Sequence, residues 1–420
     1  MLAGAPLQLV AGTIVALLAI AAAIYRPALG LAILAFTYPF DLDTYAGPVK
    51  LTTSYALLAI LVLVWVGREI LPHAPEWRRT PLDWPVLLFA AATLLSILGL
   101  LTENTGDQVI ALVKAAGGFA LFFLVTQSLR ERADVWLVVA AIAATGVIQA
   151  VMTVVPVMLG KVEVSDATRA IGTLSDPNLF AGYLVLVAAL SVAAALAVRR
   201  RWSIAAAGVI TLLFGMALVA TLSRSGWIGF LVALVTLAVL LPERRRDIAL
   251  VGAGVVAILV VIGLAGPVAG RLGGTEGGSP LDTFYARVPI WGAAWAMFIH
   301  HPIFGVGVNN FGFLIQDYDP DLVVNQAHNL FLNIAAERGI LGIATFGLVA
   351  VMAFRALRAA WRRAPELPSR ALIAGIAASI LGFFAHSLFD VSYYDYRILL
   401  MFWIVIGLAA CSPRLLTRPA

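Results

Sequence analysis

Runs of apolar residues follow one another along most of the chain, and polar residues gather in the short stretches between them. A helix needs about 20 mostly apolar residues to cross a hydrocarbon core ~30 Å thick. The first two runs are joined only by Arg26 and Pro27, so they form either two spans or one irregular hairpin. The sequence therefore predicts twelve or thirteen spans, at Leu7–Tyr25, Ala28–Ala46, Thr52–Leu71, Trp84–Leu101, Val109–Leu129, Val135–Leu159, Asn178–Val198, Ser203–Leu222, Ser225–Leu241, Ile248–Ala265, Asn329–Leu357, Ala371–Asp390 and Ile398–Cys411.

Composition supports the same class of protein. The 420 residues are 62% hydrophobic and 12% charged, with a mean hydropathy of +0.97, whereas soluble domains carry about 25% charged residues. We predict an all-α polytopic integral membrane protein with about 12 transmembrane helices. The first run has no basic start and no clear cleavage site, so we interpret it as a retained span. The single cysteine, Cys411, excludes an intramolecular disulfide, and the five histidines show no metal-binding spacing.

Basic residues divide the connections between spans into two sets. Nineteen of the 28 lysines and arginines lie in one set, near the chain ends or around Arg78, Arg130, Arg200, Arg245 and Arg362. These connections should be cytoplasmic, because cytoplasmic loops of membrane proteins are enriched in Lys and Arg. Because the basic residues lie between spans, we expect the lipid bilayer as a partner and no nucleic acid. The outer loops and the spans hold the other nine, which are Lys50, Lys114, Lys161, Arg169, Arg224, Arg271, Arg287, Arg338 and Arg397.

One outer loop, residues 266–327, is far longer than the rest. It begins Gly-rich around Gly277 and continues with a pattern typical of an amphipathic helix. Such a helix lies on the outer membrane interface with its tryptophans at headgroup depth. The apolar residues that share its face are Phe284, Val288, Trp291, Trp295 and Phe298.

Three ionisable residues stand out at the outer membrane face: Arg224 between two spans, Arg287 in the long loop, and His328 at the start of a span. Guanidinium groups bind phosphate oxygens through two parallel hydrogen bonds and keep their charge. A histidine can accept a proton from a hydroxyl near neutral pH. Together they indicate group transfer from a lipid diphosphate. For Arg224 alone, an interfacial anchor is the commoner role.

Other polar residues have structural interpretations. Glu337 and Arg338 lie about 14 Å along the helix from His328 at 1.5 Å per residue, so we expect a buried pair that holds helices together. His386 and Asp390 are four residues apart on one predicted helix, which favours a local hydrogen bond.

Two further residues leave a choice open. Asp176 precedes Pro177 at a predicted helix start, so capping is its expected role, although it could also face the outer cavity. Lys114 lies within a predicted span and should face a cavity or an acidic partner.

Several segments, in this order, resemble the conserved core of the O-antigen ligase and polymerase superfamily. The resemblance covers roughly residues 222–390, within a single transmembrane domain of residues 1–420, and includes the long loop at 266–327. The order and topological position of the segments make the likeness fairly specific. The matching segments are Ser223–Trp227, Arg287 with Trp291, His301–Phe311, His328–Asn329 followed by Glu337–Gly339 and Gly342, and His386–Asp390.

This resemblance implies a metal-independent, inverting glycosyltransferase of the GT-C-like class that needs no cofactor. It would take a glycan from undecaprenyl diphosphate at the periplasmic face of the bacterial inner membrane. Arg224 and Arg287 would hold the diphosphate and His328 would assist the acceptor hydroxyl. Asn310 and Asn329 would contact substrate, and the supporting candidates are Glu337, Arg338, His386, Asp390 and Asp176.

Three functions remain open at this point. An O-antigen ligase with lipid A-core as acceptor is our first expectation, and a polysaccharide polymerase is the alternative in the same class. From another class, a lipid-linked glycan flippase or transporter would show paired repeats and charges near the midplane. No such repeat is evident, and the candidate cations gather at one face, which favours an enzyme.

Overall fold

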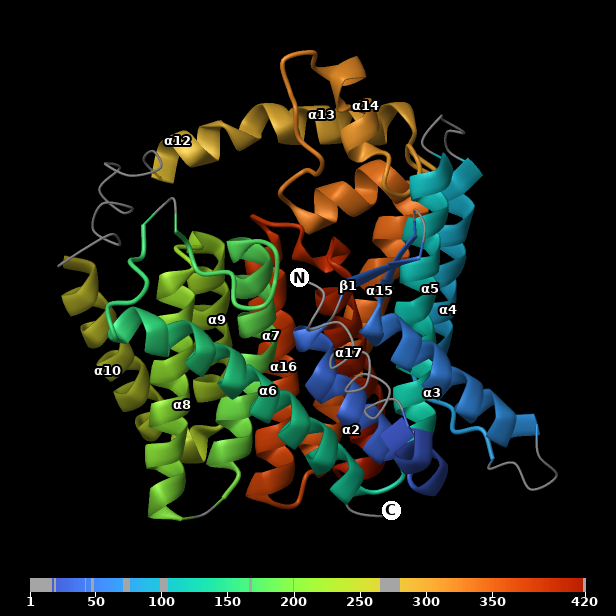
Figure 1. The fold of residues 1–420 in the computed structure, drawn as a ribbon. Helices are drawn as coiled ribbons and strands as arrows, with labels where there is room; N and C mark the ends of the chain where they lie inside the picture. The colour runs from blue at the N-terminus through green and yellow to red at the C-terminus, as the bar shows by residue number, and fades with distance from the viewer. Residues whose placement is uncertain are drawn as a thin grey trace.

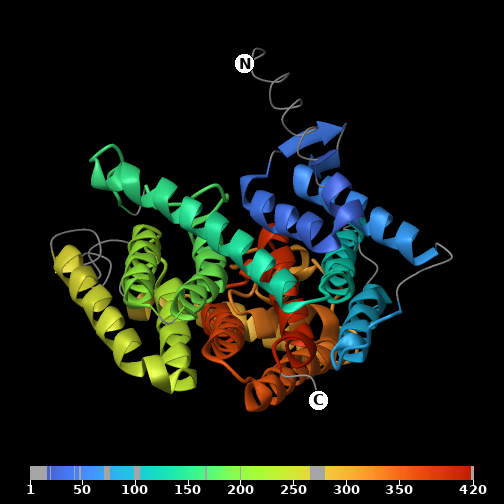
Figure 2. The ribbon, with the colours of Figure 1, turned by 90° about the horizontal axis from the view of Figure 1, so that it is seen from below.

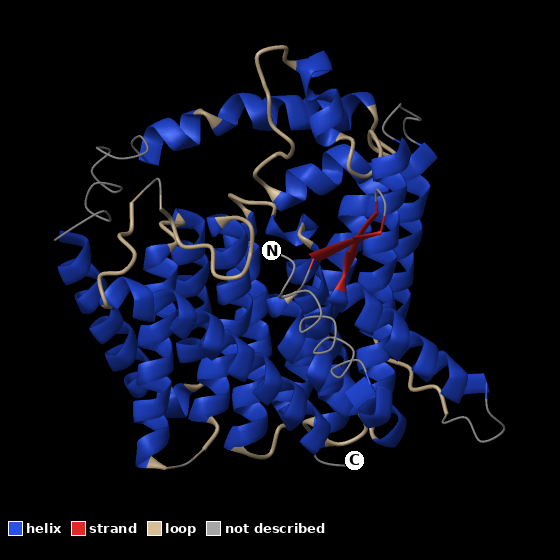
Figure 3. Cartoon of the chain, viewed as in Figure 1, coloured by secondary structure: helices blue, strands red, loops and turns tan. Residues whose placement is uncertain are grey.

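The computed structural model of the chain forms a helical bundle (Figures 1 and 3), and the all-α prediction is confirmed. Most of the first predicted span, Gly277 with the Gly-rich part of the long loop, and Arg199, Arg271 and Arg418 lie outside the described residues. The structure describes residues 17–18, 20–41, 43–46, 49–70, 76–98, 105–165, 168–198, 200–264 and 280–417.

Helices account for most of the described chain, with one short β-hairpin. The hairpin pairs β1 (Asp43–Ala46) with β2 (Val49–Thr52) in antiparallel register. The helices are α2 (Pro27–Thr37), α3 (Thr53–Ile70), α4 (Asp83–Leu95), α5 (Thr105–Ser128), α6 (Arg132–Met158), α7 (Pro177–Leu196), α8 (Arg201–Ala220), α9 (Arg224–Leu240), α10 (Arg245–Leu264), α12 (Pro280–Tyr285), α13 (Arg287–His300), α14 (Phe311–Tyr318), α15 (Leu330–Arg363), α16 (Leu367–Ser387) and α17 (Tyr396–Leu415), with 3₁₀ turns η1 (Tyr38–Phe40), η2 (Ser96–Leu98), η3 (Pro242–Arg244) and η4 (Ser392–Tyr394).

Fewer helices than predicted are long and apolar enough to cross a membrane. Within the described ranges seven qualify, namely α5, α6, α7, α8, α15, α16 and α17. An eighth span results if α9 and the start of α10, which are bent by 106° at their junction, count as one. Three shorter apolar helices, at Pro27–Phe40, Thr53–Arg68 and Asp83–Leu98, add to the bundle. The predicted count of twelve is therefore not confirmed.

The second predicted span, Ala28–Ala46, is wrong in its length. Helix α2 ends at Thr37, and one 3₁₀ turn separates it from the β-hairpin. Pro39 has no backbone N–H to continue the helical hydrogen bonds. Asp41 then accepts hydrogen bonds from the Thr53 hydroxyl and the Ser54 amide, which holds the chain against the start of α3.

The connections α3–α4, α5–α6, α7–α8, α9–α10 and α15–α16 all lie at the end of the bundle that carries the C-terminus (Figure 1). These are the arginine-rich connections of the sequence, so we call this the basic end. Helices α12, α13 and α14 lie across the opposite end (Figure 1). Long helix α6 crosses the outside of the bundle obliquely (Figures 1 and 2).

Helices α7, α16 and α17 form the centre of the bundle and are the most enclosed spans. Helix α16 packs closely on α9, because both helices carry glycine where they cross. A Cβ added at Gly229 would lie 2.6 Å from the Gly382 carbonyl oxygen, too near for any side chain. This contact fixes the height of α9 relative to the last turn of α16, where His386 lies.

The predicted interfacial helix is present as α13. One face packs on the neighbouring short helices through Ile290, Ala293, Ala294 and Met297. The opposite face leaves Val288 and Trp295 about half exposed, together with Phe284 of α12. This two-faced helix fits a position at the membrane surface.

Candidate functional site

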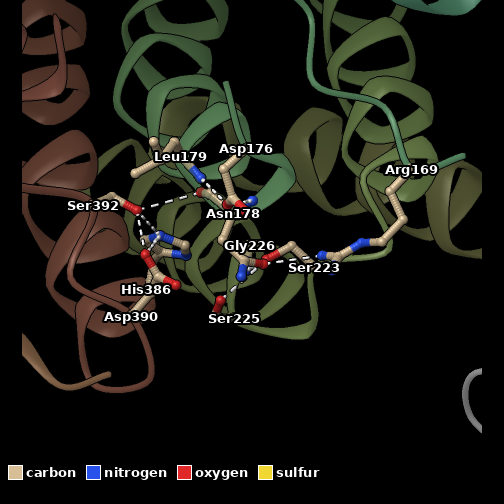
Figure 4. Close-up of polar contacts among 10 residues, drawn as sticks. All are labelled: Arg169, Asp176, Asn178, Leu179, Ser223, Ser225, Gly226, His386, Asp390 and Ser392. Carbon is tan, nitrogen blue, oxygen red and sulfur yellow. Dashed lines mark hydrogen bonds and ion pairs between the residues drawn. The ribbon is translucent and has the colours of Figure 1, made fainter. Parts of the chain in front are cut away.

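The start of α7, the start of α9 and the segment after α16 meet (Figure 4) at the end of the bundle opposite the basic end (Figure 1). Asp176 caps α7: its Oδ1 accepts from the amides of Asn178 (2.7 Å) and Leu179 (3.2 Å). The predicted capping role of Asp176 is confirmed. Ser223 caps α9 by accepting from the Gly226 amide at 3.4 Å. Helices α7 and α9 begin at these caps, and their polar groups gather beside the residues that follow the last turn of α16 (Figure 4).

A buried polar network lies at the C-terminal end of α16. His386 Nε2 lies 2.9 Å from the Ser392 hydroxyl, which donates to Asp390 Oδ1 at 2.5 Å (Figure 4). The predicted local hydrogen bond between His386 and Asp390 is wrong in its geometry, because α16 ends at Ser387 and the direct separation is 3.7 Å. Ser392 bridges the two side chains instead. The Ser392 hydroxyl also lies 3.3 Å from the carbonyl oxygen of Asn178, which joins the network to α7.

Arg169 ties two of these helix ends together, a role that sequence reasoning missed. Its Nε donates to the Thr221 carbonyl at 2.8 Å and its Nη2 to Asn178 Oδ1 at 3.1 Å. The sequence signal that could have found Arg169 is its position among the nine basic residues of the outer loops and spans. Arg169 belongs to the same set as Arg224 and Arg287, but only the latter two lie in recognisable motifs.

His328 and Arg287 are brought together by backbone contacts. The Trp291 indole Nε1 donates to the Ala327 carbonyl at 3.0 Å, which holds α13, one turn after Arg287, against the residue before His328. Asn329 caps α15 by accepting from the Phe331 and Leu332 amides, and its Nδ2 donates to the Leu388 carbonyl at 3.1 Å. The start of α15 is thereby held against Leu388, which lies two residues before Asp390 in the sequence.

Burial, and after it the neighbouring charges, set the protonation state of His328. Burial lowers the pKa of His328 below its usual value, Asp390 and Asp176 oppose that shift, and Arg287 reinforces it. Burial would raise the pKa of Asp390, but hydrogen bonds and charge from His386, Ser392 and His328 leave it below its usual value. At neutral pH the site therefore holds a neutral imidazole beside a carboxylate and a guanidinium.

The imidazole has a free proton-accepting or proton-donating position. His328 Nδ1 is buried, and no described residue makes a hydrogen bond to it. The backbone of His328 is left-handed, with φ of 48°, a conformation that is uncommon for a residue other than glycine. Strained backbone of this kind is concentrated at functional sites.

Arg224 is the first residue of α9 and is half-buried. It stands between Ser223 and Ser225, whose hydroxyl groups lie 3.1 Å apart in the polar cluster of Figure 4. The structure thus puts Arg224 at the same end of the bundle as Arg287 and His328, as expected from the sequence.

Glu337 and Arg338 lie deeper, in the interior. Arg338 is 3.4 Å from Glu337, and the Tyr394 hydroxyl donates to Glu337 Oε2 at 2.6 Å. Both side chains are buried. The helix is broken beside them at Gly339, which has φ of 61°. The pair therefore stabilises the break in α15 and lies away from the cluster around His328.

The loop before α14 packs into this break through its backbone. The amides of Val306 and Gly307 donate to the carbonyls of Ala336 (2.8 Å) and Glu337 (3.0 Å). Asn310 is fully buried and donates to the Val306 carbonyl at 2.9 Å. Asn310 and Asn329 thus both make backbone contacts that shape the site.

Comparison with known proteins identifies part of the chain. Residues 209–347 match the family model described as O-antigen ligase. No curated protein matches the chain. The matched segment contains Arg224, Arg287 and His328, while Asp176, His386 and Asp390 lie outside it and complete the cluster through the fold. This match identifies an O-antigen ligase segment in residues 209–347, and together with the apolar helices it supports a membrane protein of the glycan-processing class.

Proposed function

We propose that this protein transfers a glycan from undecaprenyl diphosphate to an acceptor hydroxyl at the periplasmic face of the bacterial inner membrane. We further propose that it acts as an O-antigen ligase with lipid A-core as acceptor. The observation that carries the proposal is the meeting of Arg287, His328 and Asp390 at one end of an apolar bundle, in a chain with an O-antigen ligase segment.

The reaction breaks the bond between the anomeric carbon and the diphosphate and forms a bond to the acceptor oxygen. The acceptor hydroxyl loses its proton, and the neutral imidazole of His328 is suited to accept it. Asp390 lies close enough to stabilise the imidazolium that results. Attack from the face opposite the leaving group inverts the anomeric configuration.

The leaving diphosphate carries negative charge that must be neutralised. Arg287 and Arg224 are the proposed partners, because guanidinium groups pair with phosphate oxygens in a fixed planar geometry. Preorganised cations at the point where charge develops lower the barrier without a metal ion. The two-faced helix α13 would keep Arg287 at headgroup depth, where the diphosphate of a membrane-anchored donor lies.

The remaining site residues have supporting roles in this proposal. The charges of Asp176 and Asp390 raise the pKa of His328. His386 and Ser392 hold Asp390 in place, and Asn329 fixes the start of α15. Asn310, Glu337 and Arg338 fix the loop and the helix break. The catalytic core would then correspond to residues 222–390 with the long loop at 266–327.

A reconstituted assay tests the function. The purified protein in lipid vesicles receives a lipid-diphosphate-linked glycan and lipid A-core, and product size is read by gel and mass spectrometry. A single added glycan per acceptor supports a ligase, and a ladder formed without lipid A-core supports a polymerase. Movement of intact donor across the bilayer without transfer would replace both with a flippase. The matched control is the His328→Ala protein in the same vesicles.

A further inference from the structure

A polar cavity of ≈ 120 Å³ lies beside η4, and neither His328 nor Asp390 lines it. Ser392 of η4 belongs to the network of His386 and Asp390, whereas Tyr393 and Tyr394 line the cavity. Helices α4, α5 and α17 and the loop before α14 form the other walls. A single water needs about 15 Å³ of such space, so this cavity has room for a larger polar group.

Lys114 lies in the wall of this cavity, within the apolar span α5. It is nine residues from the start of the helix, about 14 Å at 1.5 Å per residue. Its side chain is half-buried, and among the described residues it has no hydrogen bond or ion pair. Hydrocarbon penalises an ammonium group strongly, so a lysine at this depth indicates a polar ligand or water.

Arg338 supplies a second cationic group to the same cavity. One of its terminal nitrogens contacts Glu337 and Tyr394. Its Nε is buried and has no hydrogen-bond partner among the residues that the structure describes. A buried donor left unsatisfied costs free energy, and a ligand with an acceptor oxygen would satisfy it.

The charges around the cavity favour an anion. Glu337 already neutralises Arg338. Asp107, the one acidic residue in the wall, is exposed in the first turn of α5, two turns before Lys114. The ammonium of Lys114 is therefore the uncompensated charge inside.

From these contacts we propose that the cavity binds one phosphate group, which Lys114 pairs with and Arg338 Nε orients. The group comes either from an anionic lipid headgroup or from free phosphate, since both present the same oxygens. This site is separate from the proposed diphosphate site, because neither Arg287 nor Arg224 lines the cavity. It does not depend on the proposed transfer reaction.

A thiol reporter in the cavity tests the proposal without any activity measurement. Ala111 lines the cavity on α5 and leaves Lys114 and Arg338 in place. In a Cys411→Ser background, Ala111→Cys is modified with a sulfonate-bearing or a trimethylammonium-bearing thiosulfonate in nanodiscs of neutral lipid. The quantity measured is the ratio of the anionic reagent's rate to the cationic reagent's rate. We expect this ratio to be about tenfold higher with Lys114 present than in the Lys114→Gln form, because that substitution removes a nearby positive charge.

Added ligand then identifies the source of the phosphate. If millimolar inorganic phosphate protects Ala111→Cys in neutral lipid, the ligand is free phosphate. If phosphatidylglycerol protects it with no inorganic phosphate added, the ligand is a lipid headgroup. Lys114→Gln should abolish either protection, whereas Lys161→Gln, on an exposed connection, should not. No anion preference and no protection by either ligand would overturn the proposal. Ile110→Cys, a second cavity position, replaces the reporter if Ala111→Cys fails to fold.

Discussion

At the scale of single residues, His328 carries the chemical argument. Its neutral imidazole has a buried nitrogen without a partner in the described structure. We predict that His328→Ala inserts normally but transfers glycan about 10²–10⁴-fold more slowly, the usual cost of losing a general base. Single-turnover transfer in vesicles measures this. His328→Gln should be equally slow, because glutamine can hydrogen-bond but cannot take up the proton. Near-normal transfer by that variant would reduce His328 to a positioning role.

The pH dependence tests the charges around His328. Because His328 must be neutral to act, activity should be lost as pH falls through its lowered pKa. Asp390→Asn removes an anion that raises this pKa, so the acidic limb of the kcat/KM profile should move to lower pH. Arg287→Gln removes a cation that lowers it, so the limb should move to higher pH. A shift of both variants in the same direction would contradict the electrostatic role.

Arginine-to-lysine variants separate phosphate binding from anchoring. Lysine keeps the charge of Arg224 or Arg287 but loses the planar pair of donors. If either arginine holds the diphosphate, its lysine variant should raise the KM for the donor and lower kcat/KM about tenfold or more. If it only anchors the chain at the interface, lysine replaces it at little cost. The control is Lys161→Arg on the exposed α6–α7 connection, which should leave transfer unchanged.

The sequence predicted the candidate site residues better than the side chains that hold them in place. Arg224, Arg287 and His328 stand out because charge is scarce in this chain, and Asp176 because it precedes proline at a helix start. Ser392 and Arg169 do not stand out, since their importance comes from contacts across 214 and 52 residues of sequence respectively. Asn329 and Asn310 lie in motifs, and their contact with substrate stays a prediction, whereas the backbone contacts of their side-chain amides could not be read from the sequence.

At the scale of elements, the break in α15 should be sensitive to a single substitution. Gly339 has φ of 61°, and a Cβ there would lie 2.3 Å from the Ile303 carbonyl oxygen. We predict that Gly339→Ala destabilises the protein by at least about 1–3 kcal/mol, seen as a lower melting temperature in detergent. Gly347→Ala is the matched control on the same helix, because its Cβ meets nothing within 4 Å. A Gly339→Ala melting temperature no lower than that of Gly347→Ala would contradict this account.

Element boundaries were predictable where apolar runs end at charges or caps. The predicted run Thr52–Leu71 became α3 almost unchanged, and Asn178–Val198 became α7 with Asp176 as its cap. Hydropathy alone could not show that Ala28–Ala46 turns into a hairpin after Pro39. Nor could it show the break at Gly339, because glycine is tolerated within apolar helices and the loop that fills the break contacts it across 30 to 38 residues of sequence.

At the scale of the whole molecule, charge is distributed along one axis. The arginine-rich connections gather at the basic end (Figure 1), and the His328 cluster and helices α12 to α14 lie at the other. The positive-inside rule assigns the basic end to the cytoplasm. The proposed function depends on this orientation, because it places the site and the proposed undecaprenyl diphosphate donor at the periplasmic face.

Cysteine labelling from either side of the membrane tests the orientation. In a Cys411→Ser background, Asp319→Cys and Lys161→Cys should react with a membrane-impermeant maleimide in intact cells. Arg245→Cys and Arg362→Cys should react only after the inner membrane is opened, because transferring their connections would put several arginines on the wrong side. Gly277→Cys extends the test to the part of the long loop outside the described residues. All four described positions lie on connections or helix ends; Lys161, Arg245 and Arg362 are exposed and Asp319 is half-buried. If Asp319 and Lys161 were protected while Arg245 and Arg362 reacted in intact cells, the His328 cluster would face the cytoplasm, and the transfer would have to use a donor on that side.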